Sequence, residues 1–231
     1  MYLGVDEAGK GPVLGPMVAA AVLSDPASLP TGIDDSKRLS PERRETLDEA
    51  IRGIDGVALG VAFVEPAEID RPDTDMNTLT VRGQARAVRA ALDGRESSVR
   101  VRVVADAGDT SEARFARRLG EFVQEDSEDS EDDDPPTVDV EAYHGADESD
   151  PVVGAASVVA KVARDARMAA IDDAYPTYDG VGSGYPSDPS TRSFLRAYVA
   201  DHGDVPDCAR RSWATCDDVL AAVEQSGLDE F

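Results

Sequence analysis

Short apolar runs alternate with longer helical patterns along this chain, and this alternation constrains the fold more than any other feature. Strands are predicted at residues 2–6, 17–23, 57–65, 100–106 and 137–143. Helices are predicted after the Ser-Pro-Glu start at Ser40, over 78–92, around Phe115, Leu119 and Phe122, and over 151–171. The alternation predicts an α/β fold, followed by a small lobe with two shorter helices.

Acidic residues dominate the charge of the chain. It carries 47 Asp and Glu residues against 23 Lys and Arg residues, a formal net charge of −24. Such a charge repels nucleic acid and anionic membranes at ordinary ionic strength. A hydrophobic fraction of 41% is nevertheless too high for a disordered acidic chain. Because only three of the basic residues are lysines, we interpret the composition as adaptation to a salt-rich cytoplasm, where 1 M salt shortens the Debye length to about 3 Å.

Cysteine, histidine and hydropathy patterns exclude several other classes. The two cysteines and two histidines lack the spacing of a zinc site. The first residues show no basic leader, and the early apolar run MVAAAVL has seven residues where a membrane helix needs about 20. The sequence therefore predicts a soluble, cytoplasmic protein with reduced thiols.

Carboxylates end two of the predicted strands. Asp6 and Glu7 follow the first strand's apolar residues, and Asp106 ends the valine-rich strand 100–106. On a regular strand Asp6 and Glu7 would project to opposite faces, so they can serve one site only if the strand ends there. Sites of open α/β sheets lie at the carboxyl ends of strands. Carboxylates without His or Cys suit Mg²⁺ or Mn²⁺ and two-metal phosphoryl transfer. The alternative is an ordinary acidic loop.

The three lysines lie in compact polar motifs, AGKGP, DDSKRLS and AASVVAKVARD. A lysine can act as a compact point charge on a phosphate, which arginine does less well. On the predicted helix 151–171, a polar stripe of Ser157, Lys161, Arg164 and Asp165 crosses an apolar surface. Such a stripe is either a satisfied buried network or one wall of a site. The acidic segment 125–136 predicts a solvated, disordered loop, since it lacks the glycine and spacing of an EF-hand calcium loop.

Five blocks of the sequence resemble the signature blocks of ribonuclease HII, the type 2 ribonuclease H. They are GVDEAGKGPVLGPMV, DSKRLSPERRETL, VVADAGD, HGADESDPVVGAASVVAKVARD and GSGYPSDPSTRSFL, in family order. The resemblance as a whole covers residues 2 to about 213. The resemblance implies a ribonuclease H-like mixed sheet flanked by helices over residues 1–175 and a helical lobe over 176–224. It also implies hydrolysis of the RNA strand of RNA/DNA hybrids, and of duplex DNA 5′ of single ribonucleotides, by two Mg²⁺ or Mn²⁺ ions, leaving 3′-hydroxyl and 5′-phosphate ends.

The resemblance assigns roles to individual residues. The catalytic, metal-holding carboxylates match Asp6, Glu7, Asp106 and Asp147, whereas Asp109 and Asp150 are neighbours outside the match. The turn Gly9, Lys10 and Gly11 matches the segment whose backbone contacts the ribonucleotide and its 2′-hydroxyl. Tyr185 matches the tyrosine that packs on the ribose at the RNA-to-DNA junction. Positions that hold phosphates or support the site match Ser36, Lys37, Ser157 and Lys161. Many relatives have Arg at the position of Lys10 and a basic residue at the position of Gly145. How phosphate is bound locally therefore stays open.

The last seven residues, QSGLDEF, resemble the clamp-binding peptide of archaeal replication and repair proteins. Gln225, Leu228 and Phe231 match its Gln, aliphatic and terminal aromatic positions, so the sliding clamp (PCNA) is an expected partner. A frayed terminus is the alternative, since one aromatic stands where two are usual.

Two other functions stay open at this point. One is a related nuclease that prefers long RNA/DNA hybrids, and the other is a non-catalytic acidic protein that binds the clamp or cations. We expect a monomer that binds hybrids and ribonucleotide-containing duplex DNA and no membrane.

Overall fold

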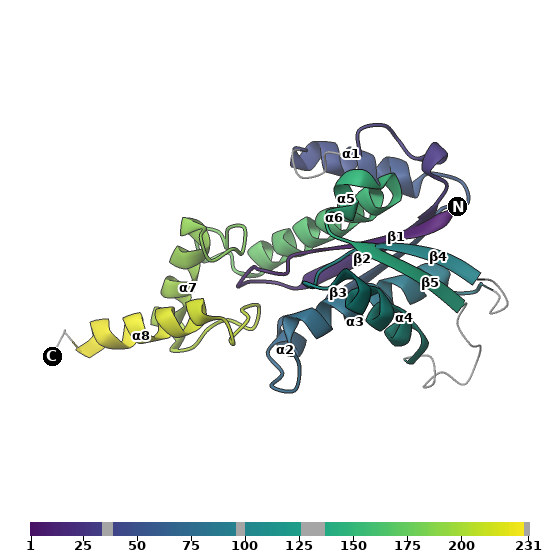
Figure 1. The fold of residues 1–231 in the computed structure, drawn as a ribbon. Helices are drawn as coiled ribbons and strands as arrows, with labels where there is room; N and C mark the ends of the chain where they lie inside the picture. The colour runs from purple at the N-terminus through teal and green to yellow at the C-terminus, as the bar shows by residue number, and fades with distance from the viewer. Residues whose placement is uncertain (34–38, 96–99, 126–136, 229–231) are drawn as a thin grey trace. The chain divides into compact units, whose positions relative to one another are not determined.

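The protein forms a five-stranded mixed sheet with helices on both faces (Figure 1). The structure is a computed structural model that describes residues 1–33, 39–95, 100–125 and 137–228. The strands are β1 (Tyr2–Ala8), β2 (Met17–Ser24), β3 (Ala58–Val64), β4 (Arg100–Asp106) and β5 (Thr137–Tyr143), and their order is β3-β2-β1-β4-β5. All five predicted strands are confirmed. The first is longer than predicted, since β1 continues through Glu7 to Ala8.

The strand pairing brings the carboxyl ends of β1 and β4 together. β2 runs antiparallel to β1, whereas β4 runs parallel to β1 and β5 runs parallel to β4. Val5 pairs with Ala105, so Asp6 and Asp106 are the next residues along these two neighbouring strands. The sheet therefore delivers two carboxylates to one edge, as the sequence predicts.

Different helices cover the two faces of this sheet (Figure 1). On one face α3 (Met76–Leu92) and α4 (Glu112–Glu125) pack against a core that includes Leu3, Val5 and Phe115. On the other face lie α1 (Pro41–Arg52), the short α5 (Ala146–Ser149) and the first part of α6 (Pro151–Ala174). A Cβ on Gly4 would overlap the backbone of Val152, so α6 approaches β1 closely because that position is glycine.

The predicted helix start at Ser40 agrees with the structure. Ser40 caps α1, since its hydroxyl accepts a 3.3 Å hydrogen bond from the Arg43 amide. On α4 Phe115 and Leu119 are fully buried, whereas Phe122 is only partly buried and Val123 completes the buried face. A short 3-10 helix, η1 (Pro26–Ser28), follows β2.

The chain divides into two compact units. The first contains residues 1–8, 18–63 and 76–163, and the second contains residues 9–17, 64–75 and 164–231. The second unit holds α2 (Pro66–Ile69), α7 (Pro189–His202), α8 (Ala214–Leu228) and the end of α6. Its core includes a cluster of aromatic rings from Tyr175, Tyr178, Phe194 and Tyr198. The two predicted C-terminal helices are thus confirmed.

Several predicted residues lie in parts of the chain that the structure does not describe. The acidic segment 126–136, Ser36, Lys37 and Phe231 lie outside the described residues. The predicted domain boundaries at 175 and 224 stay predictions. Within the described parts of the chain, no helix is both long and apolar enough to span a membrane.

Candidate active site

The side chains of Asp6 and Asp106 project to the sheet face that α6 covers. Gly4, two residues before Asp6, lies against Val152 of α6. Val104, two residues before Asp106, packs in a cluster with the first turns of α5 and α6. Because side chains alternate along a strand, both carboxylates share the face of these preceding residues. Asp6 is only 4% exposed, so its carboxyl lies in a largely water-excluded position.

Glu7 projects to the opposite face, toward α3. Its Oε2 accepts a 2.7 Å hydrogen bond from the Gln84 amide, and the same amide donates to the backbone carbonyl of Asp106 at 3.1 Å. The expectation that the strand ends at the Asp6–Glu7 pair is therefore wrong. The strand continues because residues through Ala8 still pair with β2. A single buried amide thus connects the strands that carry Glu7 and Asp106.

Burial and neighbouring charges act together on Asp6. Burial raises the pKa of its carboxyl well above the usual range, and the charges of Glu7 and Asp106 raise that pKa further. A hydrogen bond with Ser157 and the charge of Lys161 oppose this rise. The Lys161 ammonium also donates a 2.6 Å hydrogen bond to the Ser157 hydroxyl. The first half of the predicted polar stripe, Ser157 and Lys161, therefore forms one wall around Asp6.

Asp147 lies at the start of α5 and is 3% exposed. The chain enters this helix through Gly145, whose φ of 70° is in the left-handed region that favours glycine. The amide of Ala146 donates a 2.9 Å hydrogen bond to the Asp106 carboxylate. This bond attaches the start of α5 to the end of β4, so Asp147 directly follows a residue that is bound to Asp106.

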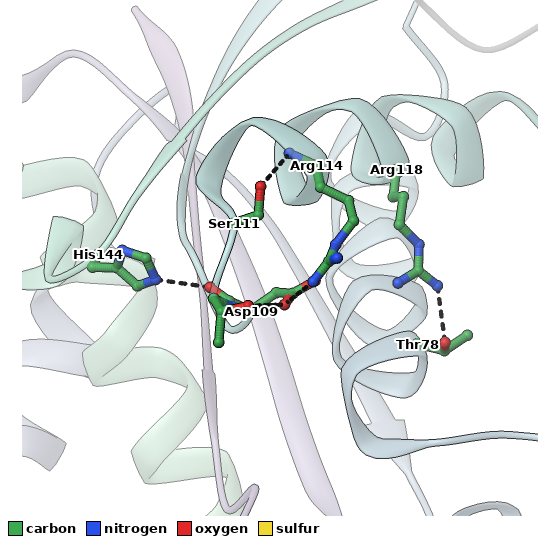
Figure 2. Close-up of polar contacts among 7 residues, drawn as sticks. Thr78, Asp109, Ser111, Arg114, Arg118 and His144 are labelled. Carbon is green, nitrogen blue, oxygen red and sulfur yellow. Dashed lines mark hydrogen bonds and ion pairs between the residues drawn. The ribbon is translucent and has the colours of Figure 1, made fainter.

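Asp109, three residues after Asp106, is engaged in local structure. Its carboxylate accepts hydrogen bonds from the Arg114 guanidinium at 2.5 and 2.9 Å (Figure 2). It also accepts one from the Thr110 amide at 2.6 Å. The Arg114 bonds lower the pKa of Asp109 to about 2. A ring nitrogen of His144 lies 2.7 Å from the Asp109 backbone carbonyl (Figure 2). The Asp109 carboxylate therefore stabilises the loop after β4.

Asp150, three residues after Asp147, is engaged in the same way. Its carboxylate accepts hydrogen bonds from the Tyr2 hydroxyl at 2.8 Å and from the first amides of α6, those of Val152 and Val153, at 2.9 and 3.1 Å. A carboxylate on the first amides of a helix satisfies donors that have no partner within the helix. Asp150 thus stabilises the start of α6.

The four carboxylates of Asp6, Glu7, Asp106 and Asp147 suit a hard divalent cation, although their side chains do not already surround one position. Among the residues that the structure describes, no three Asp, Glu, His or Cys side chains form a ready metal-binding group. The faces of the sheet explain this, since Gln84 holds Glu7 on one face while Asp6 and Asp106 lie on the other. The carboxylates offer the oxygen ligands that Mg²⁺ and Mn²⁺ prefer, and a bound cation would offset the repulsion between them.

The glycine-rich turn belongs to the second unit, where it meets Arg164 and Tyr185. Gly9 has a φ of 85°, and a Cβ there would overlap the Arg164 side chain. A Cβ on Gly11 would lie 3.9 Å from the Tyr185 ring. The guanidinium carbon of Arg164 is 5.5 Å from the centre of that ring, and Tyr185 is 43% exposed. The structure therefore brings the predicted Gly9, Gly11 and Tyr185 together.

Two polar residues near these groups were not predicted from the sequence. Gln84 is a fully buried amide on α3, and Arg210 is a fully buried guanidinium before α8. A lone Gln among the apolar residues of the predicted helix 78–92 is the signal that could have found Gln84. Arg210 lies outside the five signature blocks and has no such signal. At the C-terminal end, Gln225 is exposed on α8.

Comparison with known proteins identifies the family. A sequence model described as Ribonuclease HII matches residues 3–216. Ribonuclease HII of the halophilic archaeon Haloarcula marismortui is 55% identical over 232 residues, covering 100% of both chains. The crystal structure of ribonuclease H2 from Pyrococcus horikoshii is 32% identical, with a TM-score of 0.80, over 96% of this chain and 98% of that one. The structure of the PCNA:RNase HII complex from Archaeoglobus fulgidus is 34% identical, with a TM-score of 0.75, over 92% and 95%. The chain therefore belongs to the ribonuclease HII family, the metal-dependent endonucleases that cleave the RNA strand of RNA/DNA hybrids, and its composition marks a member from a salt-adapted organism.

Proposed function

We propose that this protein cuts duplex DNA on the 5′ side of single embedded ribonucleotides, as well as the RNA strand of longer hybrids, and leaves 3′-hydroxyl and 5′-phosphate ends. The observation that carries the proposal is a buried carboxyl, Asp6, on the same sheet face as the partly buried Asp106 of the neighbouring strand and beside Lys161. A buried carboxyl that neighbouring carboxylates repel is costly for the fold, and such sites are typical of function.

On this proposal, Asp6, Glu7, Asp106 and Asp147 hold two Mg²⁺ or Mn²⁺ ions. Glu7 joins from the other face of β1, and its charge is close enough to raise the pKa of Asp6. All four supply oxygen ligands, and the repulsion that raises the pKa of Asp6 is the kind that a bound cation relieves. When bound, the ions supply Lewis-acid stabilisation of the charge on the attacking water and on the leaving 3′ oxygen.

Residues around these carboxylates have supporting roles in the proposal. Lys161 and the Ser157 hydroxyl favour the ionised form of Asp6, because both oppose the rise of its pKa. Lys10, Ser36 and Lys37 are proposed to hold backbone phosphates, as compact cationic or hydroxyl donors do.

The second unit is proposed to recognise the ribonucleotide. Backbone amides of Gly9, Lys10 and Gly11 donate to the sugar and its 2′-hydroxyl, the group that distinguishes RNA from DNA. The exposed ring of Tyr185 packs on the ribose, and Arg164 supports the ring. An enzyme restricted to long hybrids is the alternative, and the exposed Tyr185 ring beside the turn favours junction reading.

The decisive experiment uses a duplex that carries one ribonucleotide, with Mg²⁺ or Mn²⁺ in molar salt. The wild type should cut 5′ of the ribonucleotide, and Asp106→Asn should lose nearly all turnover while its circular dichroism spectrum stays unchanged. An all-DNA duplex is the substrate control, and a long hybrid separates the two nuclease readings. Equal products from wild type and variant would instead support a non-catalytic acidic protein.

We also propose that the C-terminal residues Gln225, Leu228 and Phe231 bind the sliding clamp, and that the protein is a cytoplasmic monomer. The A. fulgidus relative was solved as a complex with PCNA, and Gln225 is exposed. Calorimetry with a purified archaeal clamp should show binding that Phe231→Ala abolishes, while cleavage is unchanged. Equal affinity of the two chains for the clamp contradicts this assignment.

A further inference from the structure

One buried side chain binds the carbonyl groups of the glycine-rich turn. The Arg210 guanidinium donates from Nη2 to the Gly9 carbonyl at 2.5 Å, from Nη1 to the Lys10 carbonyl at 2.9 Å and from Nε to the Gly15 carbonyl at 3.0 Å. The indole Nε1 of Trp213 adds a 3.3 Å bond to the Gly11 carbonyl. The segment after α7 thus binds the carbonyls of three successive residues of the turn.

This arrangement is costly, which argues for a specific role. Arg210 is 0% exposed, and its hydrogen bonds to described residues go to carbonyl oxygens rather than to a carboxylate. Burial and the charge of Arg164 lower the pKa of the Arg210 guanidinium to about 10. A buried cation of this kind gains little over a well-packed apolar residue in stability alone. What it gains here is the orientation of three backbone groups by one rigid fork.

Because each peptide group is planar, fixing the direction of a carbonyl also fixes the direction of the N–H group in the same peptide. The peptide bond is planar and trans, so each carbonyl and the following N–H point in opposite directions. With the Gly9 and Lys10 carbonyls directed at Arg210, the N–H groups of Lys10 and Gly11 point to the other side. Two successive N–H groups directed one way form an anion- or oxygen-binding concavity. A Cβ on Gly11 would lie 3.9 Å from the Tyr185 ring, so the donors and the ring belong to one surface of this unit.

We propose that Arg210, assisted by Trp213, is a positioning residue that orients the turn amides and thereby sets how strictly the enzyme selects a 2′-hydroxyl. This inference rests on the proposed function, in which these amides contact the ribonucleotide. Trp213 supports the guanidinium as well as the turn, since its ring centre lies 5.1 Å from the Arg210 guanidinium carbon. Arg210 itself touches no substrate in this account.

The test compares Arg210→Lys with Arg211→Lys in the full-length protein. Lysine keeps the charge but cannot donate to three carbonyls in fixed directions. Arg211 is the matched control, because its side chain pairs with Asp204 on the exposed surface. Two substrates are cleaved in molar salt, a duplex with one ribonucleotide and the same duplex with one 2′-fluoro nucleotide. Mn²⁺ binding by calorimetry checks that the carboxylates are undisturbed.

For Arg210→Lys we expect the ratio of kcat/KM between the two substrates to fall about tenfold, the equivalent of one well-placed hydrogen bond. Arg211→Lys should leave the ratio unchanged. A merely structural role would lower kcat/KM for both substrates equally, and that result overturns the inference.

A second variant keeps the inference testable if Arg210→Lys does not fold. Trp213→Phe removes one donor to the turn and keeps a ring beside Arg210, so it should lower the same ratio by a smaller factor. An unchanged ratio for Trp213→Phe overturns the inference in that case. A wild type that cleaves neither substrate overturns the proposed function itself, and the inference with it. An active wild type with an unchanged Arg210→Lys ratio overturns the inference alone.

Discussion

The carboxylates and the glycine-rich turn are held in place by different means. Asp6 and Asp106 lie on two paired strands, so the ladder that joins Val5 to Ala105 also sets their positions. The turn lacks such a ladder, and its carbonyls are bound by Arg210, 200 residues away from Lys10 in the sequence. Regular secondary structure positions side chains well. Positioning backbone amides requires a partner from elsewhere in the chain.

This contrast predicts that the two regions fail differently when mutated. Loss of a carboxylate should remove chemistry and leave the fold intact or more stable. Loss of a residue that positions a group should reduce activity or selectivity by smaller factors, because the reacting groups are still present.

The largest effect is expected for Asp6→Asn. A metal ion contributes several kcal/mol to the transition state, so losing a ligand should lower turnover by about 10³-fold or more. In metal-free buffer the variant should melt at a higher temperature than the wild type, because it removes a carboxyl whose ionisation is opposed by burial, Glu7 and Asp106. Cleavage kinetics and thermal melts with EDTA measure both effects.

Asp109→Asn is the matched control, since it changes a second buried aspartate near the end of β4 that has its own cation. It should retain turnover. If Asp109→Asn loses as much turnover as Asp6→Asn, the carboxylates have been assigned wrongly.

The next largest effect is expected for Gln84→Leu. Glu7 loses its 2.7 Å donor, and residues that orient metal ligands typically contribute 10- to 100-fold to activity or metal affinity. The fold should tolerate the change, because Gln84 Oε1 has no hydrogen-bond partner among the described residues and leucine has a similar volume. Mn²⁺ calorimetry and kcat/KM should fall together.

Thr80→Val provides the control on the same helix. The Thr80 hydroxyl is buried and donates to the Met76 carbonyl one turn earlier. This variant should leave Mn²⁺ affinity unchanged. Equal losses in both variants would mean that α3 packing, rather than the bond to Glu7, controls activity.

The regular elements could be predicted because their signals are local. The alternating valines of 100–106 and the Ser-Pro-Glu start at Ser40 each specify an element without reference to the rest of the chain. The end of β1 could not be predicted in this way. Its apolar pattern stops at Val5, whereas pairing with β2 carries the strand on to Ala8. A backbone ladder depends on the partner strand, which no local pattern reveals.

The same reasoning separates the predicted from the unpredicted site residues. Asp6 and Asp106 follow apolar strands, and Asp147 was assigned from the resemblance to ribonuclease HII. Gln84 and Arg210 bind groups that are 77 and 200 residues away in sequence. A buried polar residue signals that it needs a partner, but the sequence does not say which one.

Salt should change activity by a smaller factor and in an unusual direction. An ordinary basic DNA-binding protein loses about 10³- to 10⁵-fold in affinity between 50 and 200 mM salt. Here a net charge of −24 repels the substrate until salt screens it, so kcat/KM should rise between 0.1 and 1 M KCl by about tenfold for one effective charge. Circular dichroism at each salt concentration separates unfolding from weak binding. Full activity at low salt contradicts adaptation to salt.

The smallest effect concerns acid stability, and it contrasts Asp109 with Asp6. Arg114 lowers the pKa of Asp109 to about 2, whereas an unfolded aspartate titrates near about 4. The Asp109 contribution is therefore complete above about pH 4 and is lost as the pH falls toward 2. Asp6 has a raised pKa, so its ionisation lowers stability as the pH rises above about 4. Melting temperatures with EDTA should place Asp109→Asn slightly below the wild type at pH 7, converging with it near pH 2, while Asp6→Asn should lie above the wild type at pH 7. If the melting temperatures of both variants instead differ from the wild type by the same amount at every pH, the opposite pKa shifts of Asp109 and Asp6 are contradicted.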